Sequence, residues 1–562
     1  MEYTEKEDYM VFKKLLAVTA AAAMSLTAVF GFGVTPVKKA SAAAFVDMNK
    51  SQIVKVMGAG WNLGNQLEAS IGGMPNETCW GNPTISENMI KAVRNAGFSS
   101  IRVPVSYLGK IGGGSSYTID ASWLNRVKQV VDMCIKYDLY VIINMHGDGY
   151  NSVQGGWLLC NGSDQATIRA KYAACWKQIA NCFKDYDHHL IFESMNEEFD
   201  GTYGTPNRTY YSNINKLNQI FVDTVRKTGG NNAKRWLLVP GWNTNIEYTA
   251  GNYGFSVPTD NYRSSAIPSG EKRIMISVHY YDPWGFCGEE SGVSTQWGSK
   301  ATNSGKVDSY GDESYMRSMF AKMQSVFTNA GYPVVIGEYG AIDKSADDSR
   351  NAVCRADFAE KVCKYAKQYG HVPIWWDNGV TAKYGFGLFN RYTCKVTQQS
   401  IINAITSVYP STVLDTGKTY MIKNAHSGLY MDAAGAKAVN GTNVLQYSAS
   451  RAKANNTWKL VPDGKGCYYI YSVMAGGSTF LLDVANNSGA NGANIGIWQN
   501  TNCNAQRYKL FRNADGSYNI FTMSSNGNSC IEVINALTTN NGNIQQWGYN
   551  GHNCQKWNLI PQ

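Results

Sequence analysis

Two glutamates stand at the ends of short apolar runs. Glu197 closes the run 190–197, and Glu338 lies one residue from the end of the run 334–339. A pair of carboxyl groups can break a glycosidic bond. One must hold a proton and give it to the leaving oxygen, and the other must be ionised so that it attacks the sugar or activates water. Single acids are common on protein surfaces, so it is the placement of both at run ends that makes them the candidate pair.

Other polar and aromatic side chains also end apolar runs. They are Arg102, His146, Asn196, His279, Tyr281 and Trp376. A single polar or aromatic residue at the end of a run indicates little, but several such residues on different runs predict that their side chains meet at one place. Glu193 shares a strand face with Glu197 but lies roughly 13 Å deeper along an extended chain. We therefore expect Glu193 to pair below the site with an arginine such as Arg102.

The elements that must position these residues alternate in type between residues 44 and 410. Eight β-branched runs, with helix-like segments between them, occupy 56–63, 100–105, 140–146, 190–197, 236–242, 274–281, 334–339 and 372–377. Eight such repeats predict an α/β fold, a (β/α)8 TIM barrel, whose site lies where the strands end. A doubly wound sheet is disfavoured because the glycines at 58–64 miss the phosphate-loop spacing GxGxxG by one residue.

From residue 417 the sequence becomes rich in Asn and Gly and repeats three times. The acidic landmarks Asp432, Asp483 and Glu532 lie 51 and 49 residues apart, and the closing aromatics Trp458, Tyr508 and Trp557 lie 50 and 49 apart. A constant offset between separate landmarks indicates a true internal repeat. We predict a C-terminal all-β domain over 417–562.

Six motifs in the first part resemble glycoside hydrolase family 5, the cellulase family. They are GWNLGN at 60–65, IRVP at 101–104, FESMNE at 192–197, VHYY at 278–281, IGEYG at 336–340 and WWDNG at 375–379. The resemblance covers about residues 50–405. Two departures concern the residues after the motifs: Glu198 stands where the family often has Pro, and Gly147 and Asp148 follow His146.

The resemblance implies a retaining mechanism with Glu197 as acid/base and Glu338 as nucleophile. It also implies supporting roles for the other run ends: Asn196 bonds the sugar hydroxyl beside the reacting carbon, Arg102 and Tyr281 hold the nucleophile, His146 and His279 tune the acid and contact sugar, and Trp376 stacks beneath the ring. No metal and no organic cofactor are expected, because the two carboxylates suffice.

The substrate expected from the resemblance is a β-1,4-linked plant polysaccharide, most readily a glucan, cleaved by an endo-acting enzyme. A β-mannanase or a xyloglucanase of the same family is the alternative. A reading from a different class is a non-catalytic carbohydrate-binding protein, which the presence of both glutamates disfavours.

The three C-terminal repeats resemble a ricin B-type lectin domain, a β-trefoil whose lobes bind sugar. The resemblance implies candidate sugar contacts in each lobe: Asp432, Tyr447 and Asn455 in the first; Asp483, Trp498 and Gln506 in the second; Glu532, Gln545, Trp547 and Gln555 in the third. The family pattern is incomplete, since Leu445 and Gly496 replace a glutamine and Glu532 replaces Asp. The same aromatics could instead only build the trefoil core.

The N-terminus has the pattern of an export signal. Lys13 and Lys14 precede an Ala-rich apolar run, and Ala40 to Ala42 offers a small-residue cleavage site. We expect residues 1–43 to be a signal peptide, with Met10 as an alternative start, and the mature protein to be secreted, monomeric and free of membrane spans. The net charge of +9 is spread thinly over 562 residues, so no nucleic-acid partner is predicted. Thirteen cysteines leave at least one thiol unpaired.

Overall fold

A computed structural model describes residues 44–562 of the chain. The expected signal peptide, 1–43, lies outside the described residues. Among the described helices, none has the length and apolar character that a bilayer crossing requires. All thirteen cysteines lie within the described part, and none of them forms a disulfide there.

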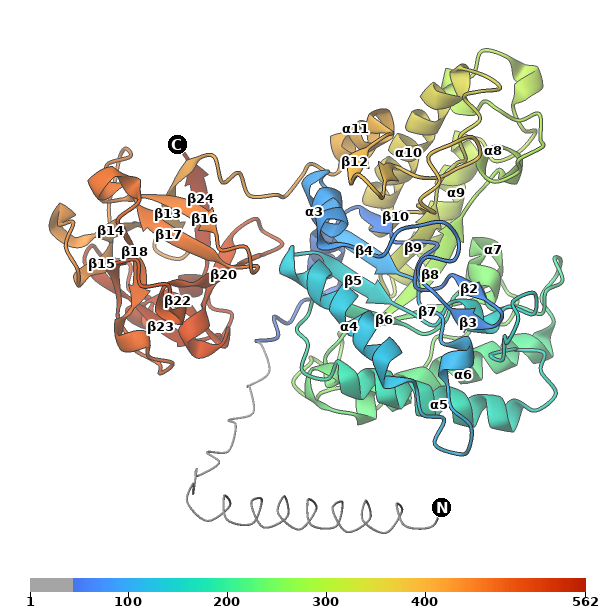
Figure 1. The fold of residues 1–562 in the computed structure, drawn as a ribbon, viewed down its shortest axis with the longest axis horizontal. Helices are drawn as coiled ribbons and strands as arrows, with labels where there is room; N and C mark the ends of the chain where they lie inside the picture. The colour runs from blue at the N-terminus through green and yellow to red at the C-terminus, as the bar shows by residue number, and fades with distance from the viewer. Residues whose placement is uncertain (1–43) are drawn as a thin grey trace, which may run out of the picture. The chain divides into compact units, whose positions relative to one another are not determined.

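The first part of the chain is a closed barrel of eight parallel strands, which confirms the predicted TIM-barrel fold (Figure 1). The strands are β1 (Gly60–Asn62), β4 (Ser100–Val103), β5 (Tyr140–Ile143), β6 (Leu190–Glu193), β7 (Leu237–Pro240), β8 (Ile274–Tyr280), β9 (Val334–Tyr339) and β10 (His371–Trp375). Each predicted run holds one of these strands. The first run starts too early, because residues 56 and 57 still belong to helix α2 (Lys50–Met57), which Asn49 caps.

Helices surround the strands and bury their apolar faces against them. They are α2, α3 (Glu87–Asn95), α4 (Ala121–Lys136), α5 (Gln165–Cys182), α6 (Arg208–Lys227), α7 (Ile246–Ala250), α8 (Trp284–Cys287), α9 (Glu313–Met323), α10 (Arg350–Tyr369) and α11 (Gln399–Val408). In α4, Asp120 accepts the backbone N–H of Trp123 and starts the helix. Trp123, Val127, Val130 and Cys134 are then buried at helical spacing. Each such side chain stabilises the fold by about 1.5–3 kcal/mol.

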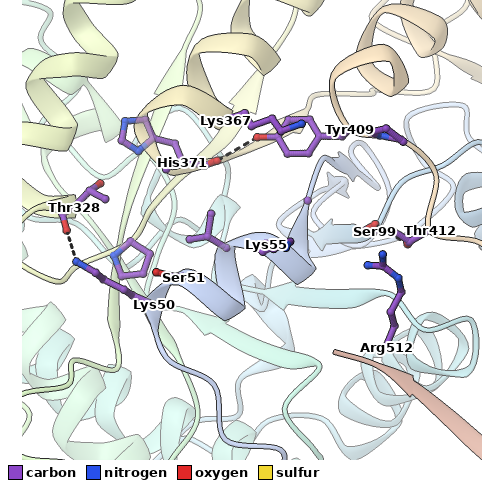
Figure 2. Close-up of a pocket in the computed structure, with 15 residues that line it drawn as sticks. Lys50, Ser51, Lys55, Ser99, Thr328, Lys367, His371, Tyr409, Thr412 and Arg512 are labelled. Atoms are coloured by element: carbon purple, nitrogen blue, oxygen red, sulfur yellow. Dashed lines mark hydrogen bonds between the residues drawn. The ribbon is translucent and has the colours of Figure 1, made fainter. Parts of the chain in front are cut away.

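The end of the barrel where strands begin carries a separate cavity beside α2. Lys50 donates from Nζ to the carbonyl of Thr328 at 3.1 Å, and Tyr409 donates to the carbonyl of His371 at 3.5 Å (dashed lines in Figure 2). None of the described residues that line this cavity is an acid. It therefore cannot perform two-carboxylate chemistry, and the candidate site lies at the opposite end.

The second part of the chain is an all-β domain of twelve strands with a threefold repeat, as predicted (Figure 1, orange to red). They are β13 (Thr419–Asn424), β14 (Tyr430–Ala433), β15 (Thr442–Tyr447), β16 (Thr457–Pro462), β17 (Tyr468–Ser472), β18 (Phe480–Val484), β19 (Ile495–Gln499), β20 (Tyr508–Arg512), β21 (Tyr518–Thr522), β22 (Ser529–Val533), β23 (Gly542–Gly548) and β24 (Trp557–Pro561). The first strand, β13, pairs along its length with the last, β24.

The closing aromatics form the centre of this domain. Trp458, Tyr508 and Trp557 are fully buried in its apolar core. Trp458 donates from Nε1 to the carbonyl of Met431, and Trp557 makes the same bond to Ile531 in its own lobe. These three residues of the repeat therefore build the core of the trefoil.

Candidate active site

Arg102 organises the end of the barrel where the strands finish. It lies on β4 and is completely buried. Its Nη1 donates to Oε1 of Glu338 at 2.7 Å, and its Nη2 donates to Oδ1 of Asn196 at 2.7 Å. The pKa of Arg102 is raised above its usual value because Glu193 and Glu338 outweigh the opposing effect of burial. The guanidinium therefore remains charged and fixes both neighbours by short, charge-assisted hydrogen bonds.

Glu193 lies beneath the candidate pair, as predicted. It ends β6 and is fully buried. Its Oε2 accepts from Nε of Arg102 at 2.7 Å and from Nδ2 of Asn144 at 3.1 Å, and its Oε1 accepts from the hydroxyl of Ser277 at 2.6 Å. With three donors around it, this carboxylate stabilises the arginine and has no free face for substrate.

Glu338 lies on β9 beside an irregularity in the sheet. The pairing of β8 with β9 runs Val278 to Ile336 and then His279 to Glu338, so Gly337 is skipped. The Gly337 carbonyl accepts from Nδ2 of Asn62 at 2.8 Å. Bulges of this kind redirect side chains next to active sites. Here the bulge sets His279 opposite Glu338, with Nδ1 3.6 Å from Oε2 of the glutamate.

Tyr281 follows β8 and completes the surroundings of Glu338. Its hydroxyl donates to Oε2 of Glu338 at 3.0 Å. The pKa of Tyr281 is raised well above its usual value by burial and by the charge of Glu338. The phenol therefore keeps its proton and acts as a donor to the carboxylate.

Glu197 lies in the loop after β6, beyond the end of the strand, and not at its last residue. Its Oε1 lies 2.6 Å from Nδ1 of His279, and its Oε2 accepts from the hydroxyl of Tyr150 at 3.0 Å. Glu198, next in sequence, faces away: it is buried and accepts the backbone N–H of Cys160. Of the two neighbours, Glu197 alone reaches the candidate site.

Glu197 and Glu338 lie close together at the end of the barrel. A carboxylate oxygen of each lies within 4.8 Å of the other and of a His279 nitrogen. Burial raises the pKa of Glu338. Burial also acts to raise the pKa of Glu197, but the contact with His279, the hydrogen bond from Tyr150 and the charge of Arg102 together outweigh burial and lower that pKa. The two carboxyl groups are held by different partners: Arg102 and Tyr281 bond Glu338, whereas His279 and Tyr150 bond Glu197.

His146 and Trp376 form an aromatic wall of the site. Their rings are stacked, with centroids 6.2 Å apart and planes 6° apart. Burial, aided by the charges of Arg102 and His279, holds the pKa of His146 well below its usual value, so this ring is neutral. Trp376 follows β10 and lies against Gly64, where a Cβ would meet the indole at 2.7 Å. A glycine at that position is what lets the indole lie there.

In the C-terminal domain the three lobes differ in the groups that surround the acidic residue of each lobe. Glu532 accepts from Nε2 of Gln545 at 3.0 Å and from Nε2 of Gln555 at 2.9 Å, so both its oxygens are engaged. Asp432 accepts from Nδ2 of Asn455 at 2.7 Å and pairs across the strands with Leu445.

Asp483, in contrast, pairs across the strands with Gly496 and lines an open cavity. The cavity has a volume of about 310 Å³ and is also lined by Asn486, Asn487 and Trp498. It exists because Gly496 has no side chain where the other lobes have Leu445 and Gln545. Gln506 is buried: it bonds the backbone at Thr501 and Gln499, and its side chain also hydrogen-bonds Asp483.

The outer aromatics of the lobes are exposed to a similar extent. Tyr447 is 42% exposed, Trp498 42% and Trp547 40%. Exposed rings beside a polar group are suited to stacking on sugar faces. Each of the three predicted lobes therefore has one partly exposed aromatic ring, and the lobes differ in the surroundings of their acidic residue.

Comparison with known proteins decides the family. The sequence profile described as "Cellulase (glycosyl hydrolase family 5)" matches residues 65–382. The chain belongs to glycoside hydrolase family 5. It is therefore a glycoside hydrolase by family. A second profile, "Ricin-type beta-trefoil lectin domain-like", matches residues 411–498 and 469–547.

The matches extend over most of the length of several bacterial family 5 relatives. "Endoglucanase A" of Paenibacillus barcinonensis is 58% identical over 70% of this chain and 98% of the relative. The structure of a family 5 xyloglucanase from Paenibacillus pabuli is 62% identical, with a TM-score of 0.63, over 64% of this chain and all of that one. A broad-specificity endoglucanase from Bacteroides salanitronis is 37% identical, with a TM-score of 0.60, over 66% and 98%.

Within this family 5 barrel, all eight predicted run-end residues lie at one end of the strands. The sequence analysis missed Tyr150, which contacts both Asn196 and Glu197, and Asn144, which supports Glu193. Tyr150 lies in the loop after β5, several residues past the run. No periodicity or motif identified in the sequence set it apart from the other tyrosines of the chain.

Proposed function

We propose that the protein is a retaining endo-β-1,4-glucanase in which Glu197 is the acid/base and Glu338 the nucleophile. The observation that carries the proposal is the approach of their carboxylate oxygens to within 4.8 Å. Retaining glycosidases hold their carboxyl groups about 5–5.5 Å apart, whereas inverting ones leave roughly 6.5–9.5 Å for a water.

In the first step, Glu338 attacks the anomeric carbon and forms an ester bond with the sugar. The bond from that carbon to the leaving oxygen breaks, its electron pair stays on the oxygen, and Glu197 supplies the proton. In the second step, a water gives a proton to Glu197 as its oxygen bonds the anomeric carbon, and the ester bond to Glu338 breaks. Arg102 and Tyr281 keep Glu338 ionised and aimed, Asn196 bonds the neighbouring sugar hydroxyl, and Trp376 stacks beneath the ring.

His279 tunes Glu197 through the contact at 2.6 Å, and His146 contacts sugar beside Trp376. The spacing of Glu197, His279 and Glu338 could also hold a metal ion. Arg102 already places a positive charge beside Glu338, and the two-step reaction needs no further cation.

The substrate we propose is a β-1,4-glucan. Relatives at 58% and 34% identity carry the names "Endoglucanase A" and "Endoglucanase B". Xyloglucan is the second candidate, because the 62% identical structure is titled a xyloglucanase. Its backbone is itself a β-1,4-glucan, so the same site serves both.

For the C-terminal domain we propose sugar binding in the second lobe, at Asp483 and Trp498. The cavity beside Gly496 leaves room for a sugar ring, and Asn486 and Asn487 offer further hydrogen bonds. The first lobe, with Asp432, Asn455 and Tyr447, is a weaker candidate. The third is the weakest, because Gln545 and Gln555 occupy Glu532. A tethered lectin domain raises the effective concentration of the enzyme at its polysaccharide.

The proposed organisation is a signal peptide at 1–43, a catalytic domain at 44–410 and a lectin domain at 417–562, secreted as a monomer. N-terminal sequencing of the exported protein tests the first boundary. A new N-terminus near residue 43 supports it, and an intact N-terminus contradicts it.

The decisive experiment measures reducing sugar released by the mature chain from carboxymethylcellulose, barley glucan, xyloglucan and mannan, with Glu338→Gln alongside. Activity on a glucan that the variant lacks supports the proposal. Glu197→Ala with azide and an activated aryl glycoside identifies the acid/base, because azide should restore turnover and give a β-glycosyl azide. Folded protein that is inactive on all four substrates favours a purely carbohydrate-binding role.

A further inference from the structure

Tyr150 lies between two residues of the proposed machinery but belongs to none of the motifs that define it. Its oxygen accepts from Nδ2 of Asn196 at 2.6 Å, and its hydroxyl donates to Oε2 of Glu197 at 3.0 Å. Both contacts are hydrogen bonds, and the one from Asn196 is slightly shorter than the usual N–H···O distance. It comes from the loop after β5, whereas its two partners come from the loop after β6.

The direction of these bonds is fixed by Arg102. Because Nη2 of Arg102 donates to Oδ1 of Asn196 at 2.7 Å, the amide NH2 of Asn196 must face the other way, toward Tyr150. A phenol has one proton to donate. With Asn196 donating to its oxygen, that proton goes to Glu197.

The phenol keeps its proton throughout. Burial, together with the charges of Glu197 and Glu338, raises the pKa of Tyr150 well above its usual value. The hydroxyl therefore donates to Glu197 and never competes with it as an acid. Glu338 has its own tyrosine, Tyr281, at 3.0 Å. Each carboxylate of the pair thus has one dedicated phenol donor.

We propose that Tyr150 is a positioning residue for the acid/base, acting on proton transfer by Glu197 and not on attack by Glu338. The inference rests on the proposed function. The titratable and charged groups that face Glu197 are His279 from β8, Tyr281 after β8, Arg102 from β4, Glu338 from β9 and Tyr150 itself. Of these, Tyr150 is the neutral group that bonds Oε2, so its removal frees that oxygen without changing the charge of the site.

Two substrates separate the two roles. Barley glucan has a poor leaving group and needs an acid, whereas 2,4-dinitrophenyl β-cellobioside has a leaving group that departs without one. For Tyr150→Phe we expect kcat/KM on barley glucan to fall about 10–100-fold, a part of the 10²–10⁴-fold effect of a positioned acid. On the dinitrophenyl substrate we expect less than about a threefold fall.

Tyr281→Phe is the matched control, because it removes the same hydroxyl from the nucleophile and should lower kcat/KM on both substrates. In Tyr150→Phe the basic limb of the pH profile on barley glucan should also move to higher pH, because ionised Glu197 loses a donor. A merely structural role moves neither the substrate ratio nor this limb.

Equal losses on both substrates, or no loss on either, overturn the inference, provided that Glu197→Gln still discriminates between them. If Glu197→Gln loses activity equally on both substrates, the proposed acid/base assignment fails instead. Thermal unfolding of Tyr150→Phe and Tyr281→Phe, measured beside the wild type, shows that each variant is folded. If Tyr150→Phe is unfolded, the basic limb is measured with 3,5-difluorotyrosine at position 150. Its stronger donor should move the limb to lower pH, and an unmoved limb overturns the inference.

Discussion

Nη1 of Arg102 lies 2.7 Å from Oε1 of Glu338, and the same guanidinium holds Glu193 from the opposite side. The proposed nucleophile is thus fixed by a buried cation that is itself fixed by a buried anion. The orientation of Glu338 is therefore set by buried protein groups.

This arrangement predicts the effect of replacing the arginine. Arg102→Lys keeps a positive charge but loses the planar fork that reaches four side chains at once. We expect kcat/KM to fall at least about 100-fold, the scale of losing one positioned charge donor. Steady-state kinetics on barley glucan measure it, with circular dichroism to confirm folding. A fall of less than threefold would mean that charge alone suffices.

Trp376 should contribute binding that a smaller aromatic partly preserves. Trp376→Ala removes the stacking surface beside His146, and we expect kcat/KM to fall about 10-fold or more, equivalent to about 1.4 kcal/mol. Trp376→Phe keeps a ring and should lose less. Equal losses in the two variants would indicate that the indole acts by filling space and not by stacking.

Glu68 should make stability depend on pH. Burial raises the pKa of Glu68 from 4.5 to about 7, although the N–H groups of Asn65 and Gln66 donate to it. Between these values the unfolded chain releases a proton that the folded chain keeps. The free energy of unfolding therefore falls as pH rises from about 5 to 7, by up to about 3 kcal/mol.

Glu68→Gln is neutral at every pH and should remove this decline. Urea unfolding of the full chain, followed by circular dichroism between pH 4.5 and 8, measures it. The wild type should lose stability relative to the variant across that window. Parallel curves for the two proteins would contradict the predicted protonation.

The lectin lobes should respond unequally to loss of their acids. In the inactive Glu338→Gln background, Asp483→Asn should weaken binding to glucose-, xylose- and galactose-terminated glycans at least about tenfold, because a charge-assisted acceptor is lost. Glu532→Gln, in the occupied third lobe, should have little effect. Glycan-array binding measures both, and the reverse order would reassign the site to the third lobe.

The sequence was sufficient to predict both folds and the gathering of the run-end residues, because strand patterns and repeats are local signals. It also predicted the pairing of Glu193 with Arg102 from the alternation of side chains along a strand. It could not reveal Tyr150, whose position depends on the path of a loop. Nor could it show that Gly496 opens a cavity, because that depends on which residue lies across from Asp483.

The pairing of β13 with β24 brings the beginning and the end of the trefoil to one place on its surface. A domain built in this way needs only a single point of attachment. It can be fused to another protein, inserted into an exposed loop or given new termini elsewhere without disturbing its own core. The trefoil of this chain is accordingly suited to transfer between enzymes as an independent targeting module.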